Sequence, residues 1–315
     1  MSVLRHVIDS ISPASAAHAE GARQNVAAAG APVLERLAAL LGGAQHTARP
    51  RSERRMIVVV AADHGVGDPG LALGASHPTA MAAAAITDGT AALAQVARAS
   101  HAPILVVDAG AVEAMPPSAV GLGRGPTRNL LVEPAMTVVD ASLGLEAGIA
   151  LAVSLVDQGL DLLVVGALGI GAEVSSAALL GTVGLTIETS DTGAREAWDK
   201  GQALAGAGTL EHLATFGGSE TCVLAGAMLA CASMNVPVIL DSYATGSAAL
   251  VAAALAPNVR GYLIAAHAGT FTHRRILDHL GLVPVFEVGL GHGEGTGAAM
   301  VIPLVDQVAA LVCGG

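Results

Sequence analysis

Six short apolar runs rich in β-branched residues, separated by longer alanine-rich segments, constrain this chain more than any other feature. The intervening segments, such as residues 80–98 and 248–256, have the apolar spacing of helices. Apolar strands that alternate with helices are typical of a parallel sheet covered on both faces. The sequence therefore predicts an α/β fold with a doubly wound, mostly parallel sheet and helices on both faces. The predicted strands are residues 56–61, 104–108, 162–166, 236–241, 262–267 and 283–288.

The first 50 residues differ from the rest, because their helical segments have charged faces and a basic stretch, residues 49–55, follows them. We expect residues 1–50 to form a small helical subdomain that is joined by the C-terminal residues 300–315. Residues 51–299 are expected to form an α/β nucleotide-binding core. A chain of 315 residues is long enough to bury such a core and to carry one small appendage.

Charge and aromatic content narrow the class of partner. The chain has 15 Lys and Arg against 26 Asp and Glu, which gives a formal net charge of -11. This balance disfavours a nucleic-acid backbone or an anionic membrane surface as the main partner. Aromatic residues make up only 2%, too few to stack successive bases of a single strand. We expect small-molecule substrates, with no nucleic acid and no membrane as partners.

A mean hydropathy of +0.62 raises the question of membrane spans, and residues 221–240 are uncharged. That stretch contains a proline, and a β-branched run follows its alanine-rich part, which favours a buried helix followed by a strand. Asp9 interrupts what would be the apolar part of a signal peptide. We therefore expect a cytoplasmic protein.

Polar or glycine-rich sequence follows five of the six predicted strands. In an open parallel sheet, ligands bind beyond the carboxyl ends of the strands, where such loops converge. The pattern predicts a small-molecule site at this edge, although Asp and Gly also end strands for ordinary turn reasons. The five loops begin at Asp63-His64-Gly65, Asp108-Ala109-Gly110, Gly166, Asp241-Ser242-Tyr243 and His267-Ala268-Gly269.

The loop at residues 166–171 has the glycine spacing G-x-x-G-x-G, which is not the dinucleotide-binding fingerprint. Its residues Gly169, Ile170 and Gly171 could cradle a phosphate, because glycines let the backbone approach and a helix expected near Ser175 would offer its positive end. A tight strand-to-helix turn without a ligand is the alternative interpretation.

The segment 289–297 surrounds a single carboxylate, Glu294, with five glycines and precedes an apolar run. A carboxylate held in such a loop suits a general base. The alternative is a glutamate that caps a helix.

Asp63, His64 and His267 are potential metal ligands, but no two of them share a spacing that would place them on one helical face. We predict neither a metal site nor a cofactor. Cys222 and Cys231 lie in an apolar helical segment and are expected to be core residues.

Motifs in the same order along nearly the whole chain resemble the nicotinate-nucleotide:dimethylbenzimidazole phosphoribosyltransferases of cobalamin lower-ligand assembly. The likeness is carried by residues 61–66, 127–129, 134–137, 216–218, 224–228, 237–241, 247–250 and 293–299. This resemblance implies a homodimer with a doubly wound sheet and a small helical domain built from both chain ends. The implied reaction displaces nicotinate from nicotinate mononucleotide with a ring nitrogen of the incoming base, and its products are an α-linked ribotide and nicotinate.

By the match to the family's Gly-Glu-Gly loop, Glu294 is the expected catalytic base. The resemblance places Asp241 and the turn 169–171 against the ribose and phosphate, with His267, Gly269 and Lys200 assisting. Gly74 and Ala82 correspond to a Ser and a Gln that lie near the benzimidazole in the family. The full predicted substrate-binding set is Asp63, His64, Gly74, Ala82, Gly169, Ile170, Gly171, Lys200, Asp241, His267, Gly269, His292 and Gly293.

The chain also departs from the family pattern. Where the family's loop after the third predicted strand has a Glu, this sequence has Ala167, and Glu173 replaces a run of neutral hydroxyl residues. The N-terminal signature is replaced by residues 29–34. Three interpretations therefore stay open: the family reaction, a same-fold enzyme with another acceptor base or donor, and a nucleotide-binding relative without catalysis.

Overall fold

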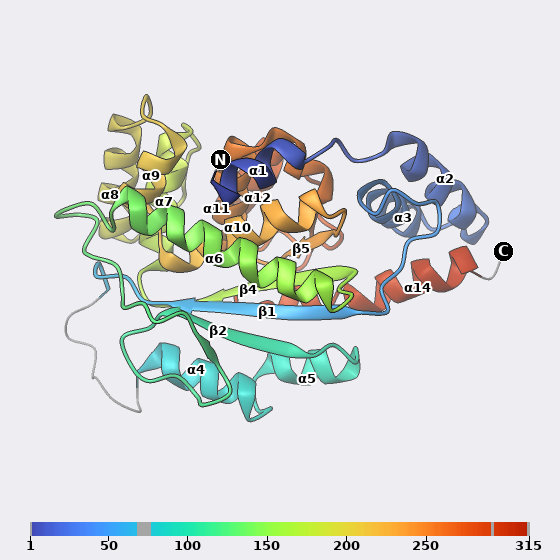
Figure 1. Ribbon diagram of the computed structural model, residues 1–315, viewed down its shortest axis with the longest axis horizontal. Coiled ribbons are helices and arrows are strands. Elements are labelled where there is room, and N and C mark those ends of the chain that lie inside the picture. Colours follow the sequence, from blue (N-terminus) through green and yellow to red (C-terminus); the bar gives the residue numbers. More distant parts are fainter. Residues whose placement is uncertain (1, 68–76, 291–292, 314–315) are drawn as a thin grey trace.

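A single parallel sheet with the strand order β3-β2-β1-β4-β5-β6 organises the computed structural model, which describes residues 2–67, 77–290 and 293–313 (Figure 1). The order runs outward in both directions from β1 and β4, as in a doubly wound nucleotide-binding sheet. The predicted fold class is confirmed. The strands are β1 (Arg55–Ala62), β2 (Ile104–Gly110), β3 (Val120–Gly121), β4 (Leu162–Leu168), β5 (Val238–Leu240) and β6 (Leu263–Ala265).

Five of the six predicted strands are present, and the prediction for residues 283–288 is wrong. Only two N–H groups of this segment bind alongside β6: that of Val285 donates to the carbonyl of Ala265, the last residue of β6, and that of Phe286 donates to the carbonyl of the next residue, Ala266, at 2.9 Å each. This segment therefore forms one isolated bridge instead of a strand. The sixth strand is β3, which pairs with β2 and has only two residues, too few for any sequence pattern.

Helices cover both faces of the sheet because alternate residues of each strand point to opposite sides. Val58 and Val60 enter the apolar cluster on one face, whereas Ile57 and Val59 enter the cluster on the other. On the first face lie α1 (Val3–Ser10), α6 (Val138–Asp157), α7 (Ala172–Thr182), α8 (Thr192–Ala203), α9 (Thr209–Phe216), α10 (Ser219–Ser233), η2 (Pro257–Tyr262), α11 (Tyr243–Leu255) and α12 (Phe271–Leu280). The second cluster takes in α2 (Ala16–Val26), α3 (Pro32–Ala44), α4 (Pro78–Thr87), α5 (Ala92–Ala99), α13 (Thr296–Ala299) and α14 (Ile302–Cys313), and η1 (Ala27–Ala29) follows α2.

Two helical segments, 78–99 and Val138–Asp157, are long and apolar enough to cross a membrane by length and composition. Both contribute to the apolar clusters that cover the sheet. The first is divided into α4 and α5 by a turn that includes Gly89 at φ +88°. A glycine accepts this left-handed backbone conformation without strain, so the continuous helix suggested by residues 80–98 is interrupted here.

The N-terminal region packs in two places. Helices α2 and α3 lie against each other and against α14, whose C-terminal end is far from the N-terminus (Figure 1). Helix α1 instead packs on α6 and α10. The proposed division into residues 1–50 with 300–315 and residues 51–299 stays a prediction.

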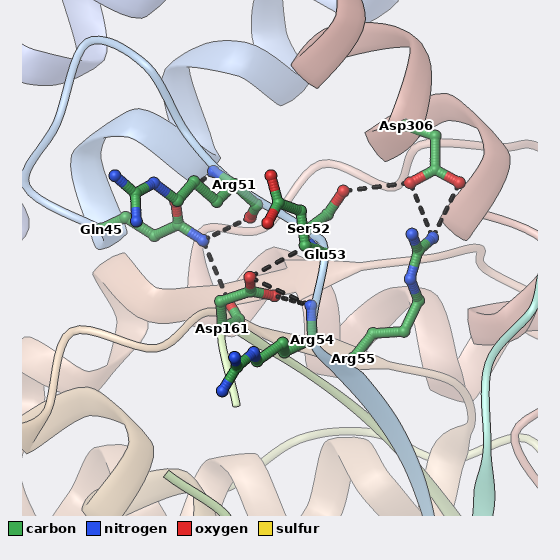
Figure 2. A network of polar contacts seen from close by, with 8 residues as sticks. All are labelled: Gln45, Arg51, Ser52, Glu53, Arg54, Arg55, Asp161 and Asp306. Atoms are coloured by element: carbon green, nitrogen blue, oxygen red, sulfur yellow. Dashed lines mark hydrogen bonds and ion pairs between the residues drawn. The ribbon is translucent and has the colours of Figure 1, made fainter. Parts of the chain in front are cut away.

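The basic stretch before β1 fastens the chain to two other elements (Figure 2). The Asp161 carboxylate accepts hydrogen bonds from the backbone N–H groups of Glu53 at 3.0 Å and Arg54 at 3.1 Å. The guanidinium of Arg55 binds both carboxylate oxygens of Asp306 at 2.7 Å. Three further residues complete this network: Gln45, Arg51 and Ser52. The entry of β1 is thereby tied to the start of β4 and to α14.

We predict that Asp161→Ala lowers the free energy of unfolding by about 1–2 kcal/mol, because two backbone donors lose their acceptor. Urea unfolding followed by circular dichroism measures this change. Asp199→Ala, at an exposed position on α8, serves as the matched control. Equal stability losses in the two variants would contradict the role assigned to Asp161.

Candidate active site

A cavity of about 350 Å³ opens beyond the carboxyl ends of β4, β5 and β6. It lies on one side of the point where the strand order reverses, between β1 and β4, which is where doubly wound sheets bind their ligands. Its walls come from the loop after β4, the first turns of α7, α8, α11 and α12, and the loop before α13. The lining residues are Ala167, Leu168, Gly169, Ala172, Glu173, Ala177, Ile187, Glu188, Thr189, Ala194, Ser242, Tyr243, Ala244, His267, Gly269, Thr270, Thr272, His273, Leu290 and Gly293.

Asp63, directly after β1, connects three neighbouring segments at this edge. One carboxylate oxygen accepts from the Thr79 hydroxyl at 2.5 Å and from the Ile170 N–H at 3.0 Å. The other accepts from the Val112 N–H at 2.8 Å. Three of the roughly four acceptor sites of this buried carboxylate are occupied by donors of the protein itself. Asp63 therefore holds the loop after β2, the start of α4 and the turn after β4 in one arrangement.

His64 forms a buried pair with Glu220, with its Nε2 at 3.1 Å from a carboxylate oxygen. Burial acts to lower the pKa of His64, but the charge and hydrogen bond of Glu220, with the charge of Asp63, outweigh it and raise the pKa. The pair lies under Gly218, where an added Cβ would stand 2.1 Å from a Glu220 oxygen. His64 is thus a buried residue that packs beside the start of α10, next to the edge of the sheet.

The turn 169–171 has the geometry that its glycines suggest. Gly169 has φ +149° and Gly171 has φ +83°, and an added Cβ on Gly169 would meet the Ala62 carbonyl at 1.7 Å. Ile170 is held at both ends, because its N–H donates to Asp63 and its carbonyl accepts from the His64 N–H at 2.9 Å. Helix α7 follows at once and starts at Ala172, three residues before the predicted position, with no side-chain cap.

Asp241, at the end of β5, anchors the loop that contains Glu294. Its two oxygens accept from the Gly295 N–H at 3.0 Å and the Ala298 N–H at 2.7 Å. On the other side of Glu294, the Gly293 carbonyl accepts from the Ala167 N–H at 3.1 Å. Glu294 is half-buried between these two attachments, beside β4 and β5.

The Glu294 backbone passes very close to β4. A Cβ added to Gly166 would stand 2.0 Å from the Glu294 carbonyl oxygen, so only glycine fits at that position of the strand. Gly293 lines the cavity, whereas Glu294 itself is not among the described lining residues.

Two imidazoles lie edge to face on the wall formed by β6 and α12. The ring centroids of His267 and His273 are 5.5 Å apart, and both side chains are buried. His267 Nε2 is 3.7 Å from an Asp241 oxygen. Burial, with the charges of His267 and Arg274, lowers the pKa of His273 to about 4. His273 is therefore neutral at physiological pH.

Four predicted site residues lie elsewhere or outside the described part of the chain. Lys200 is on α8, half-exposed, with its ammonium 3.7 Å from Glu196, and it is not among the described lining residues. Ala82 is on α4, packed against the opposite apolar cluster. Gly74 and His292 fall outside the described residues. The structure brings together Gly169, His267, Gly269 and Gly293 at the cavity. The other five predicted substrate-binding residues lie at the same edge of the sheet but are not among the described lining residues: Asp63, His64, Ile170, Gly171 and Asp241.

Two residues of the site, His273 and Glu220, are not among those predicted from the sequence. His273 follows His267 by six residues, in the first turn of a helix that starts at the sheet's edge, which is a recognisable signal. Glu220 is an isolated carboxylate at the start of an almost completely buried helix, and such a group needs a buried partner. No group of three or more His, Cys, Asp or Glu side chains in the described ranges is placed to hold a metal ion.

Fold and edge together define an α/β protein with a doubly wound sheet and a cavity at its carboxyl edge, and comparisons with known proteins narrow this class to the phosphoribosyltransferases. A family model described as "Phosphoribosyltransferase" matches residues 10–314. The nicotinate-nucleotide:dimethylbenzimidazole phosphoribosyltransferase of Roseiflexus sp. (strain RS-1) is 38% identical, covering 96% of this chain and 93% of the relative. The enzyme of the same name from Desulforudis audaxviator is 33% identical and covers 99% and 95%.

Solved structures agree with this assignment. A crystal structure of the same-named enzyme from Thermus thermophilus superposes with a TM-score of 0.79 at 33% identity, covering 89% of each chain. A crystal structure of CobT from Thermus thermophilus gives a TM-score of 0.82 at 30% identity, covering 94% of this chain and 96% of that one. The chain belongs to the nicotinate-nucleotide:dimethylbenzimidazole phosphoribosyltransferase family.

We predict that Glu220→Gln lowers the free energy of unfolding by about 3 kcal/mol, because it leaves His64 buried without its counter-charge. The folded-state pKa of His64 lies above its unfolded value. Its stabilising contribution is therefore complete below about pH 6.5 and is lost as the pH rises through the raised folded-state pKa.

Urea unfolding of both proteins at pH 5.5, 7 and 8.5 tests this prediction. The deficit of the variant should be largest at pH 5.5 and should shrink at higher pH. Glu196→Gln, which alters an exposed pair on α8, is the matched control and should change stability by less than about 1 kcal/mol. A pH-independent deficit in Glu220→Gln would refute the raised pKa.

Proposed function

We propose that this protein transfers phosphoribose from nicotinate mononucleotide to a benzimidazole-type base in cobalamin lower-ligand assembly, releasing nicotinate and an α-ribotide. The observation that carries this proposal is the anchored Glu294 loop beside the cavity, in a chain of this family. Two related enzymes with the corresponding name match this chain over nearly their full length.

The chemistry requires one proton acceptor. A ring nitrogen of the azole attacks the anomeric carbon, the bond from that carbon to the pyridinium nitrogen breaks, and nicotinate leaves with a neutral ring nitrogen. The leaving group needs no proton, whereas the attacking azole must lose its N–H proton. We assign that proton to the carboxylate of Glu294 as general base. Attachment of both flanking residues limits the motion of this carboxylate, which supports the assignment.

The donor phosphate is assigned to the turn 169–171 and the N-terminal end of α7. Ala172 and Gly169 line the cavity, and α7 lacks a side-chain cap. The N–H groups of Val174 and Ser175 donate to the Gly171 carbonyl, which leaves those of Ala172 and Glu173 available to an anion. The exposed Glu173 also lines the cavity, close to that end of the helix. This carboxylate would oppose a phosphate placed on the outer side of the turn, so we place the phosphate deeper, against Gly169.

A different acceptor base is the second candidate. Ala167 lines the cavity at a position where the family pattern has a second carboxylate. Ala82, which corresponds to a Gln of the family pattern, lies away from the cavity. These features make the pocket less polar than the family pattern implies, which would change the choice of base. A panel of azoles and purines, with product masses recorded, separates the two candidates.

We predict that Glu294→Gln lowers the rate of nicotinate release by at least about a hundredfold, because the azole proton loses its acceptor. Binding of nicotinate mononucleotide should change little, since an amide keeps the size of the side chain. Chromatography with mass detection follows release in the presence of 5,6-dimethylbenzimidazole. Thermal shift with the nucleotide alone measures binding.

Glu211→Gln, at an exposed position on α9, is the matched control and should keep full activity. If Glu294→Gln loses nucleotide binding as severely as turnover, the general-base assignment is wrong. If the native chain binds the nucleotide and yields no product with any base, the protein is a binding relative without catalysis.

The oligomeric state and surroundings of the protein are further proposals. We propose a cytoplasmic homodimer that acts on small molecules only, with neither nucleic acid nor membrane as partner. The outer side of α6 supports a dimer, because Val139 is 67% exposed and Leu143, one turn later, is 52% exposed. Apolar side chains that adjoin on a helix surface are typical of a face covered by another chain.

We expect light scattering after size-exclusion chromatography to give about twice the chain mass of 31.0 kDa. Val139→Glu should shift the protein toward the monomer, because a partner would bury the new charge. Val183→Glu, at another exposed valine, is the control. A monomeric native chain would contradict the dimer.

A further inference from the structure

Three buried ring nitrogens, on two residues that line the cavity, have no hydrogen-bond partner within the described part of the protein. They are Nδ1 and Nε2 of His267 and Nε2 of His273. Both residues line the cavity and are almost completely buried, at 2% and 3% exposure. Buried polar atoms in folded proteins are normally paired, so unpaired nitrogens on residues that line a cavity are candidates for pairing with a bound ligand.

Local hydrogen bonds fix which nitrogen of His273 carries the proton. The Gly269 N–H donates to Nδ1 of His273 at 3.4 Å, so Nδ1 accepts. A neutral imidazole has one donor and one acceptor nitrogen, and Nε2 must then carry the hydrogen. The low pKa of His273, about 4, keeps the ring neutral. His273, a residue of the cavity wall, consequently has a buried N–H donor that lacks an acceptor among the described residues.

The charge of the cavity shows what kind of acceptor is suitable. Its described lining contains the carboxylates of Glu173 and Glu188 and has neither Lys nor Arg. The loops 68–76 and 291–292, outside the described residues, contain no Lys or Arg in their sequence. An anionic oxygen bound here must be held by neutral donors, and a neutral donor to a charged acceptor gives a strong hydrogen bond.

We propose that His273 is a positioning residue that donates its Nε2–H to an anionic oxygen of the bound nucleotide. This inference rests on the proposed function, because nicotinate mononucleotide offers two such groups, the ring carboxylate and the phosphate. The helix end of α7 and His273 lie on different walls of the cavity, so the two anions can be held apart. His267 packs edge to face against His273 and keeps its ring in place.

The test compares His273→Phe, which removes the donor, with His273→Gln, which keeps an N–H donor of similar reach. His279→Phe, at an exposed position on the same helix, is the matched control. Calorimetry measures the Kd of four ligands: nicotinate mononucleotide, nicotinamide mononucleotide without the carboxylate, nicotinate riboside without the phosphate, and nicotinamide riboside without either. Thermal unfolding of each variant establishes that it is folded.

We expect His273→Phe to weaken binding of nicotinate mononucleotide by about tenfold or more, and His273→Gln to restore most of it. KM for the nucleotide should rise while kcat at saturation changes by less than about twofold. A loss that persists with nicotinate riboside identifies the carboxylate as the partner, and a loss that persists with nicotinamide mononucleotide identifies the phosphate.

Two results overturn the inference: unchanged nicotinate mononucleotide binding in His273→Phe, or an equal loss for nicotinamide riboside, which would indicate packing alone. If His273→Phe does not fold, His273→Gln and His273→Leu carry the same comparison. Failure of the native chain to bind any of the four ligands would overturn the proposed function itself, and that result is distinct from both of the others.

Discussion

The arrangement of the candidate site depends on buried carboxylates that bind backbone N–H groups at the carboxyl edge of the sheet. Asp63 accepts hydrogen bonds from the Thr79 hydroxyl and from the backbone of Ile170 and Val112. These donors come from three separate segments, so one side chain sets their mutual positions. A carboxylate that accepts several hydrogen bonds in a low dielectric holds them strongly, because ionised acceptors form stronger bonds than neutral ones.

Asp241 repeats this arrangement two strands away. It binds the N–H groups on the C-terminal side of Glu294, while Ala167 binds the loop on the other side. The sequence suggested that Asp241 faces the ribose, but both of its oxygens already accept backbone hydrogen bonds, so any contact with a sugar would use the remaining lone pairs. Its larger contribution is to place Glu294 beside the cavity, where a proposed base must have little freedom.

Strands with long apolar runs were predictable because burial on both faces leaves a pattern that one sequence reveals. Residues 283–288 are also rich in apolar residues, but they contain Pro284 and Glu287 and lie beyond β6 at the edge, where only two N–H groups find acceptors. Apolar content alone does not distinguish such an edge segment from a strand. In the site, residues next to strand ends, such as His267 and Gly169, were predictable from topology. The positions of His273 and Glu220 in the site depend on packing between distant segments. The position of Lys200 depends on the direction in which one face of α8 points. No local sequence pattern contains this information.

The acidic lining of the cavity and its neutral N–H donors together determine how an anionic ligand can bind. With Glu173 and Glu188 beside the cavity and no cation among its described walls, a nucleotide gains little from long-range attraction. In the proposed binding mode its anions are desolvated and bound by oriented N–H groups, which reward correct placement and penalise small displacements. Selectivity in such a pocket comes from geometry. Neutral donors stabilise an anion only when they already point toward it. The hydrogen bonds of Asp63 and Asp241, which hold the loops at this edge in place, are consistent with that requirement.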